Sequence, residues 1–290
     1  MALQRSTKLP ATPDNSKPFL RIAIQGERGS NSHMAALEML GDIDILPCRT
    51  SPEVFAAVVS ATADAAVLPI ENSLHGSVAE HYDLLLQNPV RIAGESLLPI
   101  RHNLIAAPGV ALAQIRTILS HPVALSQCRD WLAAFPQARA VPFYDTAGSV
   151  KHVLAEGLRD TAAIAPVLAA EVYGANVLVA GIEDHAQNVT RFHLLQRAKD
   201  PLPAASTPDK LSVAFALEHR PGTLVQALQS LAAAGVDLTR IESRPVPGRP
   251  WEYVFYVELR FTGAAMADRA LAALAPVCSM VKELGRYTAA

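Results

Sequence analysis

The sequence predicts an α/β protein made of regions with different architectures. Strands alternate with helices over roughly the first two hundred residues, which is typical of layered α/β sheets. The stretch RAKDPLPAASTPDK, residues 197–210, has the composition of a linker, and the order of elements changes after it. With 290 residues the chain is also long for a single hydrophobic core. We therefore expect two or three structural units.

The first unit opens with a strand, a turn and a helix, which is the repeat that builds a parallel sheet. FLRIAIQG, residues 19–26, is a short β-branched run ending in glycine, and SHMAALEML, residues 32–40, has helical spacing. SPEVFAAVVSA, residues 51–61, is expected to form a helix with Ser51 as N-cap and Pro52 at its first position. The other elements expected here are strands over 43–48 and 65–70, a helix over 76–88, and extended segments over 91–108 that cross to another unit.

Two further groups of elements follow along the chain. The middle repeats the first scheme, with strands expected over 115–121, 138–145 and 161–166 and helices over 122–136, 146–157 and 167–174. After the linker, strands are expected over 211–218, 236–246, 251–260 and 278–288, with helices over 221–235 and 264–277. This βαββαβ order suits a ferredoxin-like domain. Such domains can pair through their edge strands, so we expect a homo-oligomer.

Composition and charge exclude several classes of function. Hydrophobic residues make up 50% and charged residues 18%, and the net charge is −2, which predicts a globular protein without an electrostatic footprint for nucleic acid or an anionic membrane. Three cysteines without a CxxC pattern argue against disulfides and zinc and predict a reducing, cytoplasmic location. Residues 1–18 lack the apolar core of a signal peptide and are expected to be a disordered tail, and no apolar run is long enough to cross a membrane.

Two polar segments directly follow predicted strands. In GERGSNSHMAA, residues 26–36, Ser30 and Ser32 can face an anion together with the free amides of the helix start, although a purely structural glycine turn is the alternative. In PIENSLHGSV, residues 69–78, polar side chains crowd the carboxyl end of a buried strand, where ligands bind in open α/β sheets. A polar turn with capping residues would explain Ser73 but explains less well an adjacent Glu71 and Asn72.

Two more segments carry candidate reactive groups. SHPVALSQC, residues 120–128, places His121 at a strand end, where it could carry a proton or simply cap the next helix, and Cys128 has the apolar neighbours of a core residue. NVTRFHLL, residues 188–195, puts a hydroxyl beside a guanidinium at Thr190 and Arg191. No HExxH or other metal-ligand spacing occurs, so a metal is not indicated.

Taken in order, PIENSLHGSV, SHPVALSQC, NVTRF and IESRPVPGRPWEYVFYVEL resemble the motifs of prephenate dehydratases, and the resemblance covers residues 20–287. It implies a catalytic region of two α/β lobes similar to periplasmic binding proteins, with the active site in the cleft between them, followed by a ferredoxin-like ACT domain. It places lobe I at 19–97 and 186–198, lobe II at 98–185, a linker at 199–209 and the ACT domain at 210–288.

The resemblance also implies a reaction and its residues. Prephenate would lose water and carbon dioxide to give phenylpyruvate, on the route to L-phenylalanine, without a metal or organic cofactor. Thr190 matches the threonine expected to donate to the leaving oxygen, Asn72 and Gln127 match polar residues of the cleft, and all three are expected to be catalytic. Arg191 is expected to bind a substrate carboxylate. The other expected substrate-binding residues are Ser30, Ser32, Glu71, Ser73, Gly76 and Phe192.

The resemblance finally implies regulation through the ACT domain. Gly222, Thr223 and Leu224 match the family's G-A-L motif with threonine in place of alanine, and Glu242, Ser243, Arg244 and Pro245 match its ESRP motif. L-Phenylalanine is therefore expected to bind at a subunit interface of a homodimer or homotetramer and to shift the cleft between two states. Two alternatives stay open: an arogenate dehydratase, because DTAGSV at 145–150 departs from the family's STAEAA, and a non-catalytic amino-acid sensor on the same fold.

Overall fold

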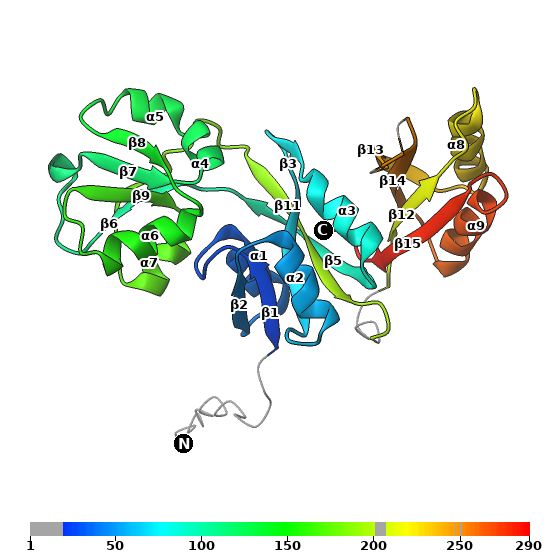
Figure 1. Cartoon of the computed structure of the whole chain (residues 1–290), viewed down its shortest axis with the longest axis horizontal. Coiled ribbons are helices and arrows are strands. Elements are labelled where there is room, and N and C mark those ends of the chain that lie inside the picture. Colours follow the sequence, from blue (N-terminus) through cyan, green and yellow to red (C-terminus); the bar gives the residue numbers. More distant parts are fainter. Residues whose placement is uncertain (1–19, 201–206, 247, 250) are drawn as a thin grey trace, which may run out of the picture.

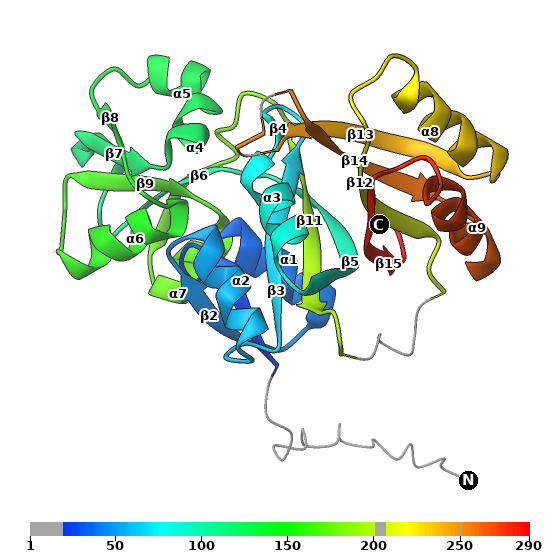
Figure 2. The same ribbon diagram turned by 45° about the vertical axis from the view of Figure 1, so that its right-hand side comes forward.

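The computed structural model describes residues 20–200, 207–246, 248–249 and 251–290. Three sheets lie in a row, with one lobe in the middle, a second lobe on one side of it and a C-terminal domain on the other (Figures 1 and 2). The tail predicted for residues 1–18 lies outside the described residues, as does the central part of the predicted linker, residues 201–206.

Lobe I is built on a six-stranded sheet in the order β2–β1–β3–β11–β5, with β4 paired to β3. The first three strands are parallel, whereas β11 is antiparallel to both of its neighbours. The chain leaves this sheet after β5, builds lobe II, and returns as β11, so two segments join the lobes (Figure 1). The strands are β1 (Arg21–Gln25), β2 (Asp44–Cys48), β3 (Ala65–Asn72), β4 (Gly76–Ser77), β5 (Val90–Pro99) and β11 (Val189–Arg197), and the helices are α1 (Asn31–Leu40), α2 (Ser51–Val59) and α3 (Ala79–Gln87).

Lobe II contains a five-stranded sheet in the order β10–β6–β9–β7–β8. Strands β7, β8 and β9 are parallel, and β6 is antiparallel to both β9 and β10. The strands are β6 (Asn103–Ala106), β7 (Thr117–Ser120), β8 (Arg139–Pro142), β9 (Thr161–Ala165) and β10 (Asn176–Ala180); the helices are α4 (Pro122–Ser126), α5 (Arg129–Ala133), α6 (Thr146–Ala155) and α7 (Val167–Tyr173), with a 3-10 helix at Leu112–Gln114. The two lobes have the arrangement predicted from the alternating strands and helices, although β10 was not expected.

The single helix predicted over residues 122–136 is wrong, because two short helices, α4 and α5, lie there. The Asp184 carboxylate accepts hydrogen bonds from the backbone N–H groups of Arg129 and Asp130, at 2.9 and 3.1 Å, and so caps a new helix start. The Asp184 N–H also donates to the carbonyl of Gln127 at 2.7 Å. A residue more than fifty positions away thus ends one helix and begins the next, which local sequence patterns cannot reveal.

Two predicted helix starts also differ from the structure. The N-cap of α2 is Thr50 rather than Ser51, whose hydroxyl instead contacts Glu80 at 2.9 Å and the His81 ring at 2.9 Å. Helix α3 begins at Ala79, because Gly76 and the next residue pair with the end of β3 as β4. Polar contacts between α2 and α3 therefore use the serine that the local pattern assigned to the cap.

The C-terminal domain has the predicted ferredoxin-like βαββαβ order. Its four strands are all antiparallel, in the order β13–β14–β12–β15, and two helices cover one face of the sheet. The strands are β12 (Lys210–Ala216), β13 (Asp237–Pro245), β14 (Tyr253–Arg260) and β15 (Met280–Tyr287), and the helices are α8 (Thr223–Ala233) and α9 (Ala264–Leu274).

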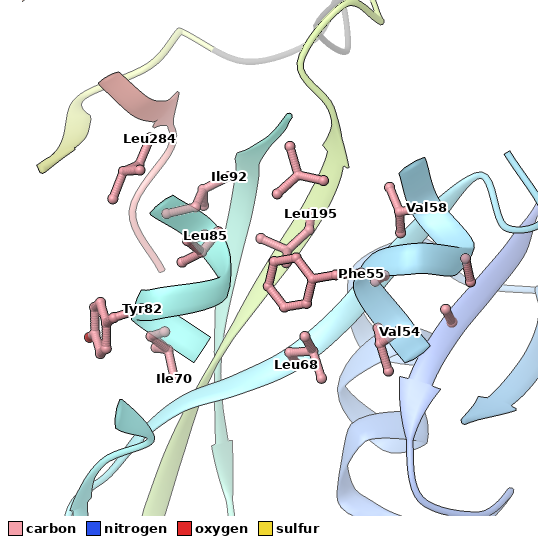
Figure 3. Close-up of a cluster of buried hydrophobic side chains, with 14 of the residues drawn as sticks. Val54, Phe55, Val58, Leu68, Ile70, Tyr82, Leu85, Ile92, Leu195 and Leu284 are labelled. Atoms are coloured by element: carbon pink, nitrogen blue, oxygen red, sulfur yellow. The ribbon is translucent and has the colours of Figure 1, made fainter. Parts of the chain in front are cut away.

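The second face of this C-terminal sheet packs on lobe I. Val213 and Phe215 of β12 face α8 and α9, whereas Ala214 between them belongs to a core shared with lobe I, as expected from strand alternation. Figure 3 shows this shared core, in which Leu284 of β15 lies next to Ile92 of β5. The two units therefore share a hydrophobic core. No helix of the described residues is long and apolar enough to span a bilayer.

Candidate functional site

A cavity of about 520 Å³ lies between the two lobes. Strand ends and helix starts of lobe I supply part of its lining, including Ser30, Ser32, Asn72, Thr190 and Phe192. Lobe II supplies the opposite wall from β7, α4 and α6, with His121, Gln127, Tyr144 and Asp145. Six of the ten residues predicted for the catalytic cleft line this cavity: Ser30, Ser32, Asn72, Gln127, Thr190 and Phe192.

Several helices point their N-terminal ends at this cavity. Ser30 caps α1, Val78 caps α3 and Asp145 caps α6, and all three line the cavity, as does Arg49, which precedes the cap of α2. The first turn of each helix has free backbone N–H groups and the positive end of the helix dipole. The cavity therefore favours an anion although the chain as a whole has a net charge of −2.

Asn72 lies at the centre of a hydrogen-bonded group of side chains that includes Thr190. Asn72 Nδ2 donates to Thr190 Oγ1 at 2.9 Å and to Asn188 Oδ1 at 2.7 Å. Asn72 Oδ1 is also fixed, because it accepts from the backbone N–H groups of Leu74 and His75 at 3.0 and 3.1 Å. Since the Thr190 oxygen already accepts from an amide, its own proton is free to be donated into the cavity.

Gln127 is held between two histidines. Its Oε1 atom accepts from His102 Nε2 at 2.7 Å, and its Nε2 atom lies 3.1 Å from His75 Nδ1. His102 also lines the cavity, and burial lowers its pKa, so that it is neutral near pH 7 and acts as a hydrogen-bond donor. Because His75 is in lobe I and Gln127 in lobe II, this contact also crosses the cleft.

Arg191 and Glu71 lie outside the cavity, contrary to the expectation that they bind substrate. Thr190 pairs with Asn72 and Arg191 pairs with Glu71 in the β11–β3 register. Neighbouring residues of a strand face opposite sides of a sheet, so the first pair faces the cavity and the second faces the C-terminal domain. Arg191 Nη2 is 2.7 Å from Glu71 Oε2. The role of carboxylate clamp predicted for Arg191 is therefore corrected.

Ser73 and Gly76 also lie outside the cavity lining. The Ser73 hydroxyl accepts from the Val189 N–H at 3.0 Å and donates to the Gln187 carbonyl at 3.4 Å. Gly76 is exposed and has a φ of 75°, which glycine adopts at little cost. Both residues shape the turn beside Asn72, so the expectation that they bind substrate is corrected in favour of the polar-turn alternative.

Sequence reasoning missed other residues of the cavity, above all Arg49. Within the described residues it is the one lysine or arginine that lines the cavity. It follows β2 directly, at the sheet edge where ligands bind in open α/β sheets, and this rule could have identified it. Glu27 of lobe I, which was also missed, lines the cavity and contacts lobe II, because it accepts from Tyr144 at 3.0 Å and pairs with Lys151 at 2.9 Å.

The residues expected to bind an effector lie in two separate places in the C-terminal domain. Gly222, Thr223 and Leu224 line a pocket of about 180 Å³ that also includes Trp251 and Tyr253. The other group turns toward lobe I: Glu242 accepts from Ser77 at 2.8 Å and Arg244 pairs with Asp83 at 2.8 Å, while Ser243 and Pro245 are exposed. Within one chain the two groups do not form a single site.

The fold and the cavity define a two-lobed α/β protein with a cleft between its lobes and an appended βαββαβ domain, and no group of three His, Cys, Asp or Glu side chains suited to a metal occurs among the described residues. The family model for prephenate dehydratase matches residues 22–200. The chain is 39% identical, over 92% of its length and 72% of the relative's, to arogenate dehydratase/prephenate dehydratase 2 of Arabidopsis thaliana. The chain belongs to the prephenate dehydratase family.

Two solved structures are similar to this chain over most of their length. Prephenate dehydratase from Arthrobacter aurescens, determined in complex with L-phenylalanine, has 34% sequence identity and a TM-score of 0.83, over 93% of this chain and 90% of that one. A protein described as a novel type of quorum quenching acylase has 34% identity and a TM-score of 0.84, over 93% and 98% of the two chains.

The cytoplasmic location predicted from the cysteines is contradicted by the relatives. Besides the Arabidopsis thaliana protein above, two others from the same plant are named as chloroplastic. The prediction was wrong because free cysteines distinguish only reducing from oxidising compartments and cannot tell one reducing compartment from another. All three cysteines are indeed free thiols, and Cys48 and Cys128 are buried.

Proposed function

We propose that this chain is a dehydratase that converts prephenate to phenylpyruvate, water and carbon dioxide in L-phenylalanine biosynthesis. The observation that carries the proposal is the Asn72 to Thr190 hydrogen bond, which leaves the threonine proton free to be donated into the cavity between the lobes. In this reaction the ring hydroxyl leaves and takes a proton from solvent to become water, the bond to the ring carboxylate breaks to release carbon dioxide, and the electron pair of that bond completes the aromatic ring.

Thr190 acts by donating a hydrogen bond to the departing hydroxyl as negative charge develops on that oxygen. Asn72 orients the hydroxyl, and Gln127, fixed by His102, offers a second amide from the opposite wall. These groups need no reorganisation during the reaction, because each is already held by a partner. No cofactor is needed, since aromatisation supplies the driving force.

The cavity holds the two substrate carboxylates with donors other than Arg191. Arg49 supplies a guanidinium, Ser30 and Ser32 supply hydroxyl groups, and the first turn of α1 supplies backbone N–H groups. Phe192 adds an apolar surface on the lobe I side, which suits the cyclohexadiene ring. The combination of anion donors with an apolar surface supports a small dicarboxylate with a hydrocarbon ring as the ligand class.

Arogenate is the alternative substrate, and it differs from prephenate by an amino group in place of the keto oxygen. Several plant relatives carry the name arogenate dehydratase. The carboxylates of Glu27 and Asp145 line the cavity and could receive an ammonium group, although both already have hydrogen-bond partners. Either substrate uses the same Thr190 chemistry.

A similarity to an acylase makes acyl transfer the second activity to test. Acyl transfer by a threonine requires a base that removes its proton. In the described residues the Thr190 hydroxyl has an amide, and no histidine or carboxylate, as its hydrogen-bond partner. This environment favours donation of the proton over nucleophilic attack.

We propose L-phenylalanine as the effector, bound by the Gly222–Leu224 loop of one subunit and the Glu242–Pro245 strand of another in a homodimer or homotetramer. The separation of these two groups within one chain supports an interface site. The Arthrobacter aurescens structure, which was determined with L-phenylalanine, supports the same ligand.

The first experiment is to incubate the purified protein separately with prephenate and arogenate and to follow phenylpyruvate and phenylalanine by chromatography. A blank without protein at the same pH is essential, because prephenate aromatises spontaneously in acid. An N-acyl homoserine lactone in a third reaction tests the acylase alternative. Phenylpyruvate formed above the blank from prephenate is the expected result.

Other outcomes discriminate among the alternatives. Turnover of arogenate alone would assign the chain to arogenate dehydratases. Phenylalanine binding without turnover of any substrate would indicate a sensor on the same fold. A titration with L-phenylalanine, followed by activity and by sedimentation, tests the regulatory part, for which we expect loss of activity.

A further inference from the structure

A buried cluster of charged side chains lies between lobe I and the C-terminal domain. Arg191 is hydrogen-bonded to Glu258, lies 2.7 Å from Glu71 and lies 3.6 Å from Glu95. Lys210 Nζ is 2.7 Å from Glu258 and 2.8 Å from Glu95. The Glu95 and Glu258 side chains are only 4% and 6% exposed. We call these five residues the interdomain ion-pair cluster.

The interdomain ion-pair cluster joins the two units by charge. Its lobe I members come from β3, β5 and β11, and its C-terminal members, Lys210 and Glu258, come from β12 and β14. Arg240 of β13 adds a further contact, since its Nε atom is 3.3 Å from Glu71 Oε1. Burial alone would raise the pKa of Glu258, but Arg191 and then His193 and Lys210 lower it to about 2, so the carboxylate is ionised.

The same strands carry the proposed catalytic residues on their other face. Thr190 and Asn72 face the cavity, and their chain neighbours Arg191 and Glu71 are members of the cluster. In the β11–β3 ladder the two pairs are adjacent, and the register shifts directly after Arg191. Such bulges fix the direction of the side chains near them. A displacement of Arg191 is therefore passed to Thr190 through one peptide unit.

Stability alone does not account for a cluster of this kind. Removing charges from water costs solvation energy that their attraction repays only in part, and apolar replacements are often neutral or stabilising. A polar network that is nearly closed to water does, however, fix one geometry among several. Here the geometry it fixes includes the backbone beside the proposed catalytic hydroxyl.

We propose that Arg191 is a positioning residue, which holds Thr190 in place through its bond to Glu258 and thereby makes catalysis depend on the seating of the C-terminal domain. This inference rests on the proposed function for its effect on turnover. Its structural part, the link from Glu258 to the backbone of residues 188–192, can be measured without any activity.

The test compares the full chain with Glu258→Gln, Glu71→Gln and Arg191→Lys. Steady-state kinetics and hydrogen–deuterium exchange of residues 188–192 are measured for each, with circular dichroism to confirm folding. For Glu258→Gln we expect kcat to fall by roughly 10- to 100-fold, because a misplacement of about 1 Å can cost a hundredfold, with KM within about twofold and faster exchange. Arg191→Lys, which keeps the charge but loses the fork, should be intermediate.

Asp83→Asn is the matched control, because it breaks another bond between lobe I and the C-terminal domain. Asp83 pairs with Arg244 at 2.8 Å but lies on α3, away from β11. It should leave basal kcat and the exchange of residues 188–192 unchanged. Glu71→Gln should destabilise the fold least, because the Glu71 side chain is 36% exposed and is the most exposed of the cluster.

The outcomes separate this inference from the proposed function. Slower turnover and faster exchange in Glu258→Gln, with Asp83→Asn unaffected, would support it. Normal exchange in Glu258→Gln, or faster exchange with unchanged kcat, would overturn it. Equal effects in Asp83→Asn would show a general loosening of the interface and would also overturn the inference. If the unmodified protein turns over no substrate, the proposed function fails, but the exchange data still decide whether Glu258 holds the backbone beside Thr190.

Discussion

Replacement of Thr190 by valine tests the proposed chemistry most directly, because it removes the hydroxyl while keeping the side-chain shape. Asn72 Nδ2 loses one acceptor but keeps Asn188 Oδ1 at 2.7 Å and the Val189 carbonyl at 3.3 Å. No buried donor is left unpaired, so the free energy of unfolding should change by less than about 1 kcal/mol.

The expected effect on catalysis is much larger than the effect on stability. Loss of one hydrogen bond that strengthens in the transition state typically lowers kcat by about 100- to 1000-fold, or about 2.7–4 kcal/mol of activation free energy. KM should change little, because Thr190 does not carry the substrate's charge. Thr190→Ser, which keeps the hydroxyl, should retain most of the activity.

The assay is initial-rate formation of phenylpyruvate, with urea unfolding of each variant as the control for stability. A Thr190→Val protein with kcat within about threefold of the unmodified chain would refute the assigned role, given the 100-fold loss expected for such a donor. A rise in KM with unchanged kcat would instead place Thr190 among the residues that bind the ground state.

Three further results are expected. His193 is 2% exposed, and burial lowers its pKa to about 3. The unfolded chain therefore binds one more proton than the folded chain as pH falls below about 6.5, and the free energy of unfolding should decrease by about 2 kcal/mol between pH 7 and pH 5. Urea titrations at the two pH values should show this decrease, and it should be absent in His193→Leu. Gly29→Ala would place a methyl group 2.7 Å from the Ala169 backbone at a φ of 88°, so it should destabilise the chain by roughly 2–4 kcal/mol in thermal unfolding. Gly41→Ala, at a φ of 75° with open space around it, should cost only about 1–2 kcal/mol, and equal losses would contradict the packing argument. Leu284→Ala should reduce the free energy of unfolding by about 2–5 kcal/mol in urea, because this side chain is buried between the C-terminal domain and lobe I; a loss below about 1 kcal/mol would show that this interface is not a core.

The overall fold could be predicted from the sequence because its signals are local. Alternating strands and helices indicate α/β lobes, and the βαββαβ order indicates the C-terminal domain, in agreement with the three sheets. The break between α4 and α5 could not be predicted, because it depends on the distant Asp184 carboxylate. Strand β10, residues 176–180, was missed although NVLVA has the β-branched composition of a strand.

The sequence indicated several residues that line the cavity, but it was misread for the direction in which Arg191 points. Thr190, Asn72 and Gln127 were expected in the cleft and line the cavity. Arg191 was expected to join them, yet the period of two in a strand places it on the opposite face from Thr190. The alternation of side chains along a strand can be read from the sequence. The partners of Arg191 on the opposite face cannot, because Glu258 belongs to another domain and no local sequence pattern shows how that domain packs on lobe I.

The place of β11 in the sheet has a consequence for how the chain folds during synthesis. Strands β3 and β5 flank a gap that only Val189–Arg197 fills, and all of lobe II is made before this segment is available. Until then each of the two strands presents an unpaired edge, which is a site where chains can associate wrongly. Lobe II can complete its own sheet first, since its five strands are contiguous in the chain. The segment that carries the proposed catalytic threonine therefore also completes the lobe I sheet, because it pairs with the facing edges of β3 and β5 in the same step that places the hydroxyl.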